Sequence, residues 1–339
     1  MSQGFADLGI APKLLEVLTQ LNFTTPTPIQ VQAIPVAATG RDVIGIAQTG
    51  TGKTLAFSLP MLQRIAKAKQ RGLIVLPTRE LALQVDEELQ KVAGSLGLKT
   101  ALLIGGESQP KQLKQLKKNP HIIIGTPGRI NDLLEQGEVS LDTVGVLVLD
   151  EADRMLDMGF KPQIERIVQH VPEERQTMLF SATMPPEIMR LVNRYMVNPT
   201  KVEVATAGTV TDRVEQELYV LEKQQKNQLL EKLLTDHDGT VLVFSRTKYG
   251  AKKISRSIRN MGYDAAELHS NLTLGQRRRS LEGFKKGKHR VLVATDIASR
   301  GIDVTNIELV VNYDLPDNPE DYVHRVGRTG RAGQMGKAI

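Results

Sequence analysis

The sequence has no cysteine, no tryptophan and only 13 other aromatic residues, seven Phe and six Tyr. Without cysteine it can form neither disulfide bonds nor thiolate metal sites, and it has no cysteine nucleophile. It also lacks a long apolar run and a secretory start, so we expect no membrane span, no secretion and a cytoplasmic location. With few rings on which bases could stack, any nucleic acid would be bound mainly through its sugar-phosphate backbone.

The length of 339 residues corresponds to about two domains, at about 100–200 residues each. The net charge of +6 is unevenly distributed. Residues 1–205 carry 22 Lys/Arg and 21 Asp/Glu, whereas residues 206–339 carry 22 and 17. Residues 251–290 alone carry 11 basic and 3 acidic residues, a local +8 that suits either a polyanion or a solvated helix face.

Short β-branched runs alternate with helical patterns along the whole chain, which predicts α/β domains built on doubly wound parallel sheets. In the first half we predict helices at Thr54–Lys67 and Arg79–Leu96 and strands at Val43–Ala47, Leu73–Leu76, Ala101–Ile104, Ile122–Ile124, Val144–Leu149, Thr177–Phe180 and Val202–Val204. In the second half we predict helices at Lys226–Leu234 and Tyr249–Met261 and strands at Glu217–Leu221, Val241–Phe244, Ala265–Leu268, Val291–Ala294 and Leu309–Asn312.

The domain boundary is predicted at residues 206–213, because Ala205–Asp212 has no apolar periodicity and is rich in Thr, Ala and Gly. This gives an N-terminal domain over 1–205 and a C-terminal domain over 214–339. Gly336–Ile339 reads as the entry to another strand, so we expect the second domain to be truncated at its C-terminal end.

A glycine-rich segment, AQTGTGKT at residues 47–54, lies between a predicted strand and a predicted helix. Gly50 and Gly52 would let backbone N–H groups surround a phosphate. Lys53 would reach the β- and γ-phosphates, and Thr54 would hold Mg²⁺. A chance Gly-Lys-Thr turn is the alternative, and the strand and helix on either side argue against it.

Two acids follow the apolar strand Val144–Leu149. Acids at the carboxyl end of a parallel strand lie where such sheets bind ligands, so Asp150 fits a Mg²⁺ ligand and Glu151 fits the group that orients and activates water. An Asp-Glu pair can also be a helix N-terminal charge. The glycine-rich loop favours the metal, and the two motifs together predict an NTP hydrolase.

The string HRVGRTGR at residues 324–331 places three arginines in eight residues. Arg328 and Arg331 are three apart and would share a face in a helical turn. Since the second half has no phosphate loop of its own, we interpret them as fingers that act on a γ-phosphate held by the first domain. A solvated arginine cluster is the alternative. The interpretation requires domain closure.

These motifs, about ten in order from Phe5 to Gly336, resemble those of the DEAD-box ATP-dependent RNA helicases of superfamily 2. The resemblance implies two tandem RecA-like domains, ATP and Mg²⁺ as cofactors, and RNA-stimulated ATP hydrolysis that locally separates RNA duplexes. NFTTPTPIQ at residues 22–30 is similar to the adenine-selecting Q motif, with Asn22 where the family usually has Gly. Ser299 likewise stands where Ala is more frequent.

The resemblance also implies residue roles. Catalysis would involve Lys53, Asp150, Glu151, His324, Arg328 and Arg331, with Thr54 and Asp150 at the metal. The nucleotide would be bound by Phe5, Phe23, Thr25, Gln30, Gln48, Thr49, Gly50, Thr51, Gly52, Lys53, Thr54 and Asp303. Strand separation would be coupled to hydrolysis through Ser181, Ala182 and Thr183, which otherwise read as a cap after a strand. RNA would be bound by Pro77, Thr78, Arg79, Gly105, Gly106, Thr126, Gly128, Arg129, Ser245, Arg246, Gln276, Arg279 and Thr295.

The partner implied by the resemblance is RNA, single-stranded or duplex, bound without sequence preference because backbone contacts carry no sequence information. We expect a monomer with ribonucleoprotein or ribosome-assembly partners and no membrane contact. Two other functions remain open: an ATP-dependent RNA clamp with little unwinding, and a DNA translocase. The Q-motif stretch counts against the translocase.

Overall fold

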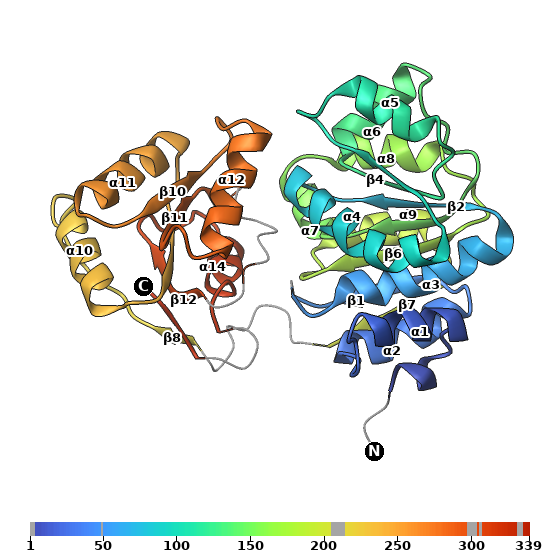
Figure 1. Ribbon diagram of the computed structural model, residues 1–339, viewed down its shortest axis with the longest axis horizontal. Helices are drawn as coiled ribbons and strands as arrows, with labels where there is room; N and C mark the ends of the chain where they lie inside the picture. Colours follow the sequence, from blue (N-terminus) through green and yellow to red (C-terminus); the bar gives the residue numbers. More distant parts are fainter. Residues whose placement is uncertain (1–3, 49, 205–213, 297–303, 305–306, 331–334) are drawn as a thin grey trace. The chain divides into compact units, whose positions relative to one another are not determined.

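The computed structural model describes residues 4–48, 50–204, 214–296, 304, 307–330 and 335–339. The chain divides into two compact units, unit 1 over residues 1–207 and unit 2 over residues 208–339 (Figure 1). The predicted linker at 206–213 lies outside the described residues.

Unit 1 contains a seven-stranded parallel sheet in the order β3-β4-β2-β5-β6-β1-β7. Its strands are β1 Val43–Ile46, β2 Arg71–Val75, β3 Thr100–Leu103, β4 Ile122–Gly125, β5 Val144–Leu149, β6 Gln176–Ser181 and β7 Thr200–Glu203. Every residue of β1, β4, β5 and β6 is buried, because a parallel sheet is covered on both faces and its strands can be apolar throughout.

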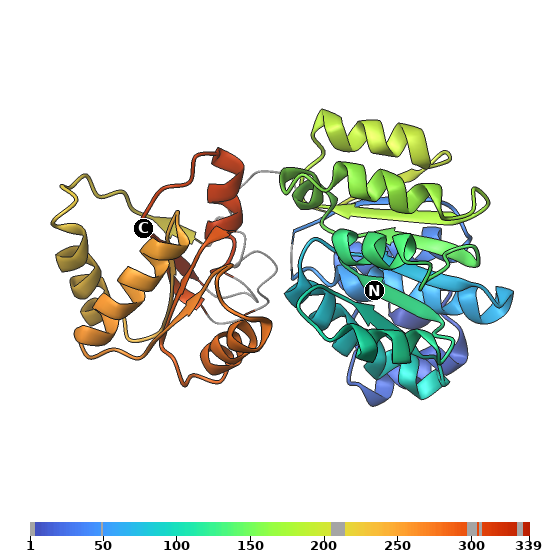
Figure 2. The same ribbon diagram turned by 90° about the horizontal axis from the view of Figure 1, so that it is seen from above.

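The described helices of unit 1 are α1 Pro12–Gln20, α2 Pro28–Ala38, α3 Lys53–Ala68, α4 Arg79–Ala93, α5 Gln109–Leu116, α6 Pro127–Glu135, α7 Ala152–Asp157, α8 Lys161–Gln169 and α9 Pro186–Tyr195, with 3-10 turns at Phe5–Leu8 and Gly94–Leu96. Neighbouring residues of a strand point to opposite faces. Leu179 of β6 packs into the core that α6, α8 and α9 cover, whereas Phe180 contacts Phe57 of α3, with ring centroids 5.5 Å apart. Helices therefore cover both faces of the sheet (Figure 2).

Unit 2 contains a six-stranded parallel sheet in the order β10-β11-β9-β12-β13-β8. Its strands are β8 Val214–Gln216, β9 Thr240–Phe244, β10 Ala265–Leu268, β11 Val291–Ala294, β12 Ile307–Asn312 and β13 Gly336–Ala338, and its described helices are α10 Lys226–Asp236, α11 Lys248–Asn260, α12 Leu274–Lys285 and α14 Pro319–Val326. One face of the sheet packs on α10 and α11, the other on α12 and α14. Unit 2 therefore repeats the layers of unit 1.

The predicted α/β class with doubly wound parallel sheets is confirmed, and the strand at the C-terminal end is β13. The predicted strand Glu217–Leu221 is wrong. The strand lies just before it, at Val214–Gln216, since these are the residues that pair with the three residues of β13. Leu218 and Val220, whose apolar character suggested a strand, are 78% and 95% exposed.

No helix among the described residues is long and apolar enough to cross a bilayer.

Candidate active site

The glycine-rich loop connects β1 to α3 as predicted. Gly50 and Gly52 have φ values of 81° and 89°, in the left-handed region that favours glycine. A Cβ on Gly52 would lie 2.5 Å from Nε2 of Gln30 and 2.9 Å from Oγ1 of Thr27. Nε2 of Gln30 instead donates to the Gly52 carbonyl at 3.0 Å. The predicted adenine reader is therefore bonded to the phosphate loop.

Lys53 begins α3 and is buried, with only 6% of its surface exposed. Among the residues that the structure describes, its Nζ has no hydrogen-bond partner, and it lies 3.8 Å from Oδ1 of Asp150. A buried ammonium group without a hydrogen-bond acceptor is costly unless an anion joins it, so this loop fits a bound phosphate.

Oxygen donors for a magnesium ion are present as well. Asp150 directly follows β5 and Thr54 is the second residue of α3, and hydroxyl and carboxylate oxygens suit Mg²⁺. Within the described residues, no cluster of three or more His, Cys, Asp or Glu side chains could hold a metal alone.

Burial raises the pKa of the Asp150 carboxyl to about 6, an effect that the Lys53 ammonium opposes and the Glu151 carboxylate reinforces. The ionised form that a metal needs is therefore less favoured than in a free carboxyl, and a bound cation would favour it.

Glu151 lies between β5 and α7 with a φ of 51°, unusual for a residue with a side chain. Its backbone N–H donates to Oδ1 of Asp150 at 2.9 Å, and its Oε2 lies 2.5 Å from Nη1 of the buried Arg154. Our sequence reasoning missed Arg154. An opposite charge three residues after Glu151 on a helix was the available signal.

Asp153 joins the predicted coupling residues. Its Oδ2 accepts hydrogen bonds from the backbone N–H of Ala182 at 3.0 Å and of Thr183 at 2.8 Å, and from the Thr183 hydroxyl at 3.0 Å. The Asp153 N–H donates to Oγ of Ser181 at 3.1 Å. Because β5 and β6 are neighbours, the segments that follow them meet at one edge of the sheet.

The remaining predicted nucleotide contacts of unit 1 differ in burial. Phe5 is buried in the first 3-10 turn, Phe23 is half-buried and Thr25 is exposed. Thr51 donates from Oγ1 to the Gln48 carbonyl at 2.8 Å. Asn22 has a φ of 60°, a conformation that Asn tolerates, so it can stand where the family has Gly.

Three predicted RNA-binding segments of unit 1 follow adjacent strands at one sheet edge. Thr78 caps α4 through Oγ1, after Pro77 and before Arg79. A Cβ on Gly105 would lie 2.8 Å from Nη2 of Arg79, and one on Gly106 only 2.5 Å from Nη1, so the two glycines leave room for this guanidinium group.

The third segment begins α6, with Thr126 at its N-cap and Gly128 in its first turn. Nε of Arg129 donates to Oε1 of Gln112 on α5 at 3.1 Å. This bond ties the start of α6 to the loop that carries Gly105 and Gly106, since Nε2 of Gln112 donates to the Ile104 carbonyl at 2.9 Å.

In unit 2, Ser245 and Arg246 follow β9. Oδ2 of Asp314 accepts from Oγ of Ser245 at 3.2 Å and from the Arg246 N–H at 3.1 Å. Sequence reasoning missed Asp314. The register that pairs Asn312 with Phe244 brings it there, and strand order is not visible in a hydrophobic pattern.

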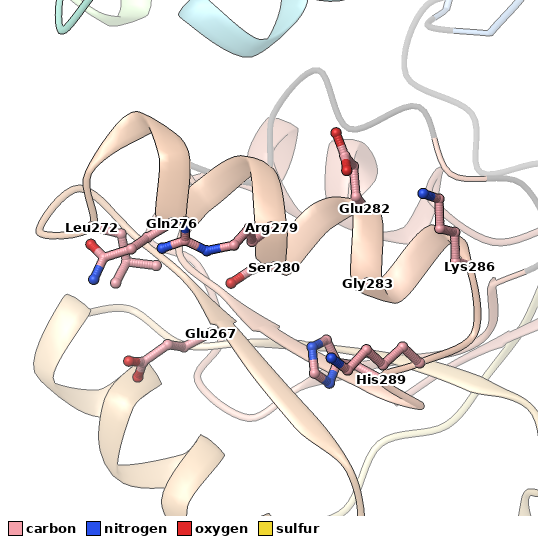
Figure 3. Close-up of a pocket in the computed structure, with 10 residues that line it drawn as sticks. Glu267, Leu272, Gln276, Arg279, Ser280, Glu282, Gly283, Lys286 and His289 are labelled. Atoms are coloured by element: carbon pink, nitrogen blue, oxygen red, sulfur yellow. The ribbon is translucent and has the colours of Figure 1, made fainter.

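Gln276 and Arg279 lie on α12. Oε1 of Gln276 accepts from the Thr273 N–H at 2.8 Å in a capping box. Figure 3 shows both side chains at a pocket of about 540 Å³, together with Lys286 and His289. Thr295 follows β11 and donates from its N–H to the Leu268 carbonyl at 3.2 Å.

The helical face predicted to be shared by Arg328 and Arg331 is not tested, because Arg331 lies outside the described residues. Helix α14 contains His324 and ends at Val326, so Arg328 lies in the following turn, where its Nε donates to the His324 carbonyl at 3.2 Å. The predicted contacts Thr49, Asp303 and Arg331 lie outside the described residues, as does Ser299.

Arg325 is held by a buried ion pair and by contact with an aromatic ring. Its Nε and Nη2 pair with the two carboxylate oxygens of Asp296 at 2.5 and 2.6 Å, and its guanidinium carbon lies 4.9 Å from the Phe244 ring centroid. Arg325 is 2% exposed and holds α14 to the sheet.

Two family models match the chain: DEAD/DEAH box helicase over residues 27–191 and helicase conserved C-terminal domain over residues 225–333. The chain is 43% identical over 339 residues to ATP-dependent rRNA helicase RRP3 of Yarrowia lipolytica, covering 99% of this chain and 71% of that protein. The chain belongs to the DEAD/DEAH box helicase family. It is also 44% identical over 338 residues to ATP-dependent RNA helicase CshA of Listeria monocytogenes, covering 99% of this chain and 65% of the relative.

Solved structures of helicases agree with this assignment. S. cerevisiae Dbp5 bound to RNA and ADP BeF3 is 32% identical, with a TM-score of 0.88 over 99% of this helicase and 88% of that chain. Mss116p bound to ssRNA and AMP-PNP is 28% identical, with a TM-score of 0.91 over 100% and 74%. The tandem RecA-like fold expected from the sequence is thus confirmed.

Proposed function

We propose that this helicase hydrolyses ATP in response to RNA and uses the cycle to separate RNA duplexes locally. The observation that carries the proposal is the buried Lys53 ammonium, which lies 3.8 Å from Asp150 and has no hydrogen-bond partner among the described residues, at the end of a loop with two glycines in the left-handed region. The RNA and nucleotide named for Dbp5 and Mss116p support the same substrates here.

Within this proposal, Lys53 binds the terminal phosphates and Gln30 reads adenine. Thr54 and Asp150 hold Mg²⁺, which supplies positive charge that offsets the negative charge developing on the phosphates. Glu151 orients the attacking water, and its bond to Arg154 limits where its carboxylate can point.

Unit 2 contributes the residues that would act on the nucleotide when the two units close around it. We assign Arg328 and Arg331 to the γ-phosphate, His324 to the link with residues 150–153, and Asp303 to the ribose. Because ATP and RNA would each contact both units, each favours the closed arrangement by its differential affinity. Hydrolysis and phosphate release then loosen the closed state, and the Asp153 bonds to Ala182 and Thr183 transmit the change.

The RNA contacts proposed in both units are loop ends and helix starts that carry Gly, Thr and Arg, which suit phosphate and 2′-OH groups and not base edges. We therefore propose binding without sequence preference. The rRNA helicase name of the Yarrowia relative favours the structured RNA of ribosome assembly as the physiological substrate.

The experiment measures steady-state phosphate release and strand displacement with RNA and with DNA of the same sequence. We expect RNA alone to stimulate hydrolysis, and displacement to require ATP. Glu151→Gln should retain ATP and RNA binding and lose turnover. A rate indifferent to RNA contradicts the proposal, equal stimulation by DNA favours the translocase, and stimulation without displacement favours the clamp.

A further inference from the structure

We propose that the outer face of α11 is a second RNA-binding surface, which binds the phosphate backbone of a single strand that continues past the loop after β9. This inference rests on the proposed function, since the surface would extend the RNA contacts assigned to Arg246. We call Tyr249, Lys252, Lys253 and Arg256 the α11 cation face.

The charge of α11 is of one sign. The helix has five basic residues in 13 and no acidic residue. Lys252, Lys253 and Arg256 are exposed, and none of them takes part in an ion pair with the described residues. A surface of uncompensated cations attracts a polyanion.

The side chains of the α11 cation face lie on one side of the helix. At about 100° per residue, the other three fall within about 60° of Arg256, opposite the buried Ala251, Ile254 and Ile258. Arg259 differs, because its Nη1 donates to Oγ of Ser255 at 2.7 Å and to the Ala265 carbonyl at 3.0 Å. These two hydrogen bonds give Arg259 a structural role, and Arg259 is one of the basic residues that give residues 251–290 their net charge of +8.

The α11 cation face continues from the proposed RNA site. Arg246 is followed by the N-cap Thr247, whose hydroxyl accepts from the Gly250 N–H at 3.0 Å, and the helix starts at the next residue. At about 1.5 Å per residue, Lys252 and Arg256 lie about 6 and 12 Å along the helix axis from Lys248, the first residue of α11. A single RNA strand that leaves Arg246 along α11 would therefore meet a cation about once per nucleotide.

The neighbouring helix shows that this charge is not needed for packing. Helices α10 and α11 cover the same face of the sheet and lie side by side (Figure 1). Helix α10 carries two basic and two acidic residues, so it covers the sheet without net charge.

The α11 cation face also has a ring for base stacking, since Tyr249 is 71% exposed.

The experiment compares Lys252→Gln/Arg256→Gln with Lys223→Gln/Lys232→Gln, a control that removes two exposed charges from the same unit. Affinity for a short oligouridine and for one several times as long is measured across a salt series, with a non-hydrolysable ATP analogue. For the first variant and the long RNA we expect the salt slope to fall by about 1.4, roughly 0.7 per phosphate contact, and affinity near 0.15 M salt to fall about tenfold. The short RNA should bind as it does to the parent protein.

Equal losses in both variants would mean that net charge alone acts, and equal losses for short and long RNA would place these cations in the core site. Either result overturns the inference. If the parent protein hydrolyses ATP faster with short RNA while both variants bind long RNA alike, only this inference fails. Absence of RNA stimulation in the parent protein is instead a failure of the proposed function.

Discussion

The two units hold their candidate residues in different ways. In unit 1 these residues bond to one another: Gln30 to Gly52, Lys53 beside Asp150, and Asp153 to Ala182 and Thr183. The candidate phosphate-binding residues of unit 1 are therefore held together within one compact unit.

In unit 2 the candidate residues Ser245 and Arg246, and Arg325 beside the candidate His324, bond to acids that belong to the scaffold. Asp314 accepts from Ser245 and from the Arg246 backbone, while Asp296 pairs with Arg325. Unit 2 therefore holds these arginines through its own acids, and the comparison sharpens the proposal that unit 1 binds the nucleotide while unit 2 completes its chemistry.

Replacing Arg328 with Ala tests that division most severely. If unit 2 completes the chemistry, turnover with RNA should fall about 10³-fold or more, while the affinity for ATP changes little. Phosphate release and nucleotide binding are measured on the same preparation. Lys53→Ala is the counterpart in unit 1 and should lose nucleotide affinity itself. Near-parental turnover of Arg328→Ala would place all the phosphate chemistry in unit 1.

Replacing Arg325 with Met should damage the frame of unit 2. Removing one partner of a buried ion pair costs about 3–5 kcal/mol, because the remaining Asp296 charge loses its cation. Chemical unfolding of the parent and the variant measures the loss. Arg278→Met is the matched control: its pair with Glu282 is more than half exposed on the Arg side, so it should cost under about 1 kcal/mol. Equal losses of unfolding free energy in the two variants would show that the buried pair of Arg325 does not stabilise unit 2 more than an exposed pair does.

Replacing Asp150 with Asn should stabilise the ligand-free protein, because the folded carboxyl has a pKa of about 6 against 3.8 in the reference state. A raised folded pKa favours folding only while the group is protonated, so the parent protein loses stability as the pH rises from about 4 to about 6. The variant should exceed the parent by up to about 3 kcal/mol at pH 8, at 1.36 kcal/mol per pKa unit. Without Mg²⁺ and nucleotide, the gap should close below pH 4. A constant gap would contradict the pKa.

Sequence patterns located the strands and the motif loops because each depends on a few neighbouring residues, such as the apolar run Val144–Leu149 before two acids. The bonds between loops depend on strand order, which no local pattern contains. Asp153 meets Thr183 only because β5 adjoins β6, and Asp314 meets Arg246 only because β12 adjoins β9.

Side-chain partners were the second feature that the patterns could not supply. Arg325 and Arg328 stand in one arginine string, and only the packing of Arg325 on Phe244 and Asp296 separates a frame residue from a candidate finger. Pairing explains the misplaced strand in the same way: apolar alternation marked residues 217–221, while the ladder to β13 uses Val214–Gln216.

The same Leu→Ala substitution at two positions of unit 2 tests this last point. Leu218 lies in the segment that the pattern marked as a strand, yet it is 78% exposed, so Leu218→Ala should change the free energy of unfolding by no more than about 0.5 kcal/mol. Leu242 of β9 is fully buried, and Leu242→Ala should cost about 2–5 kcal/mol. Denaturant unfolding of both variants gives the two values. A cost above about 2 kcal/mol at Leu218 would mean that residues 217–221 pack as a core strand, since a large penalty for the lost side-chain atoms arises only where they are removed from water.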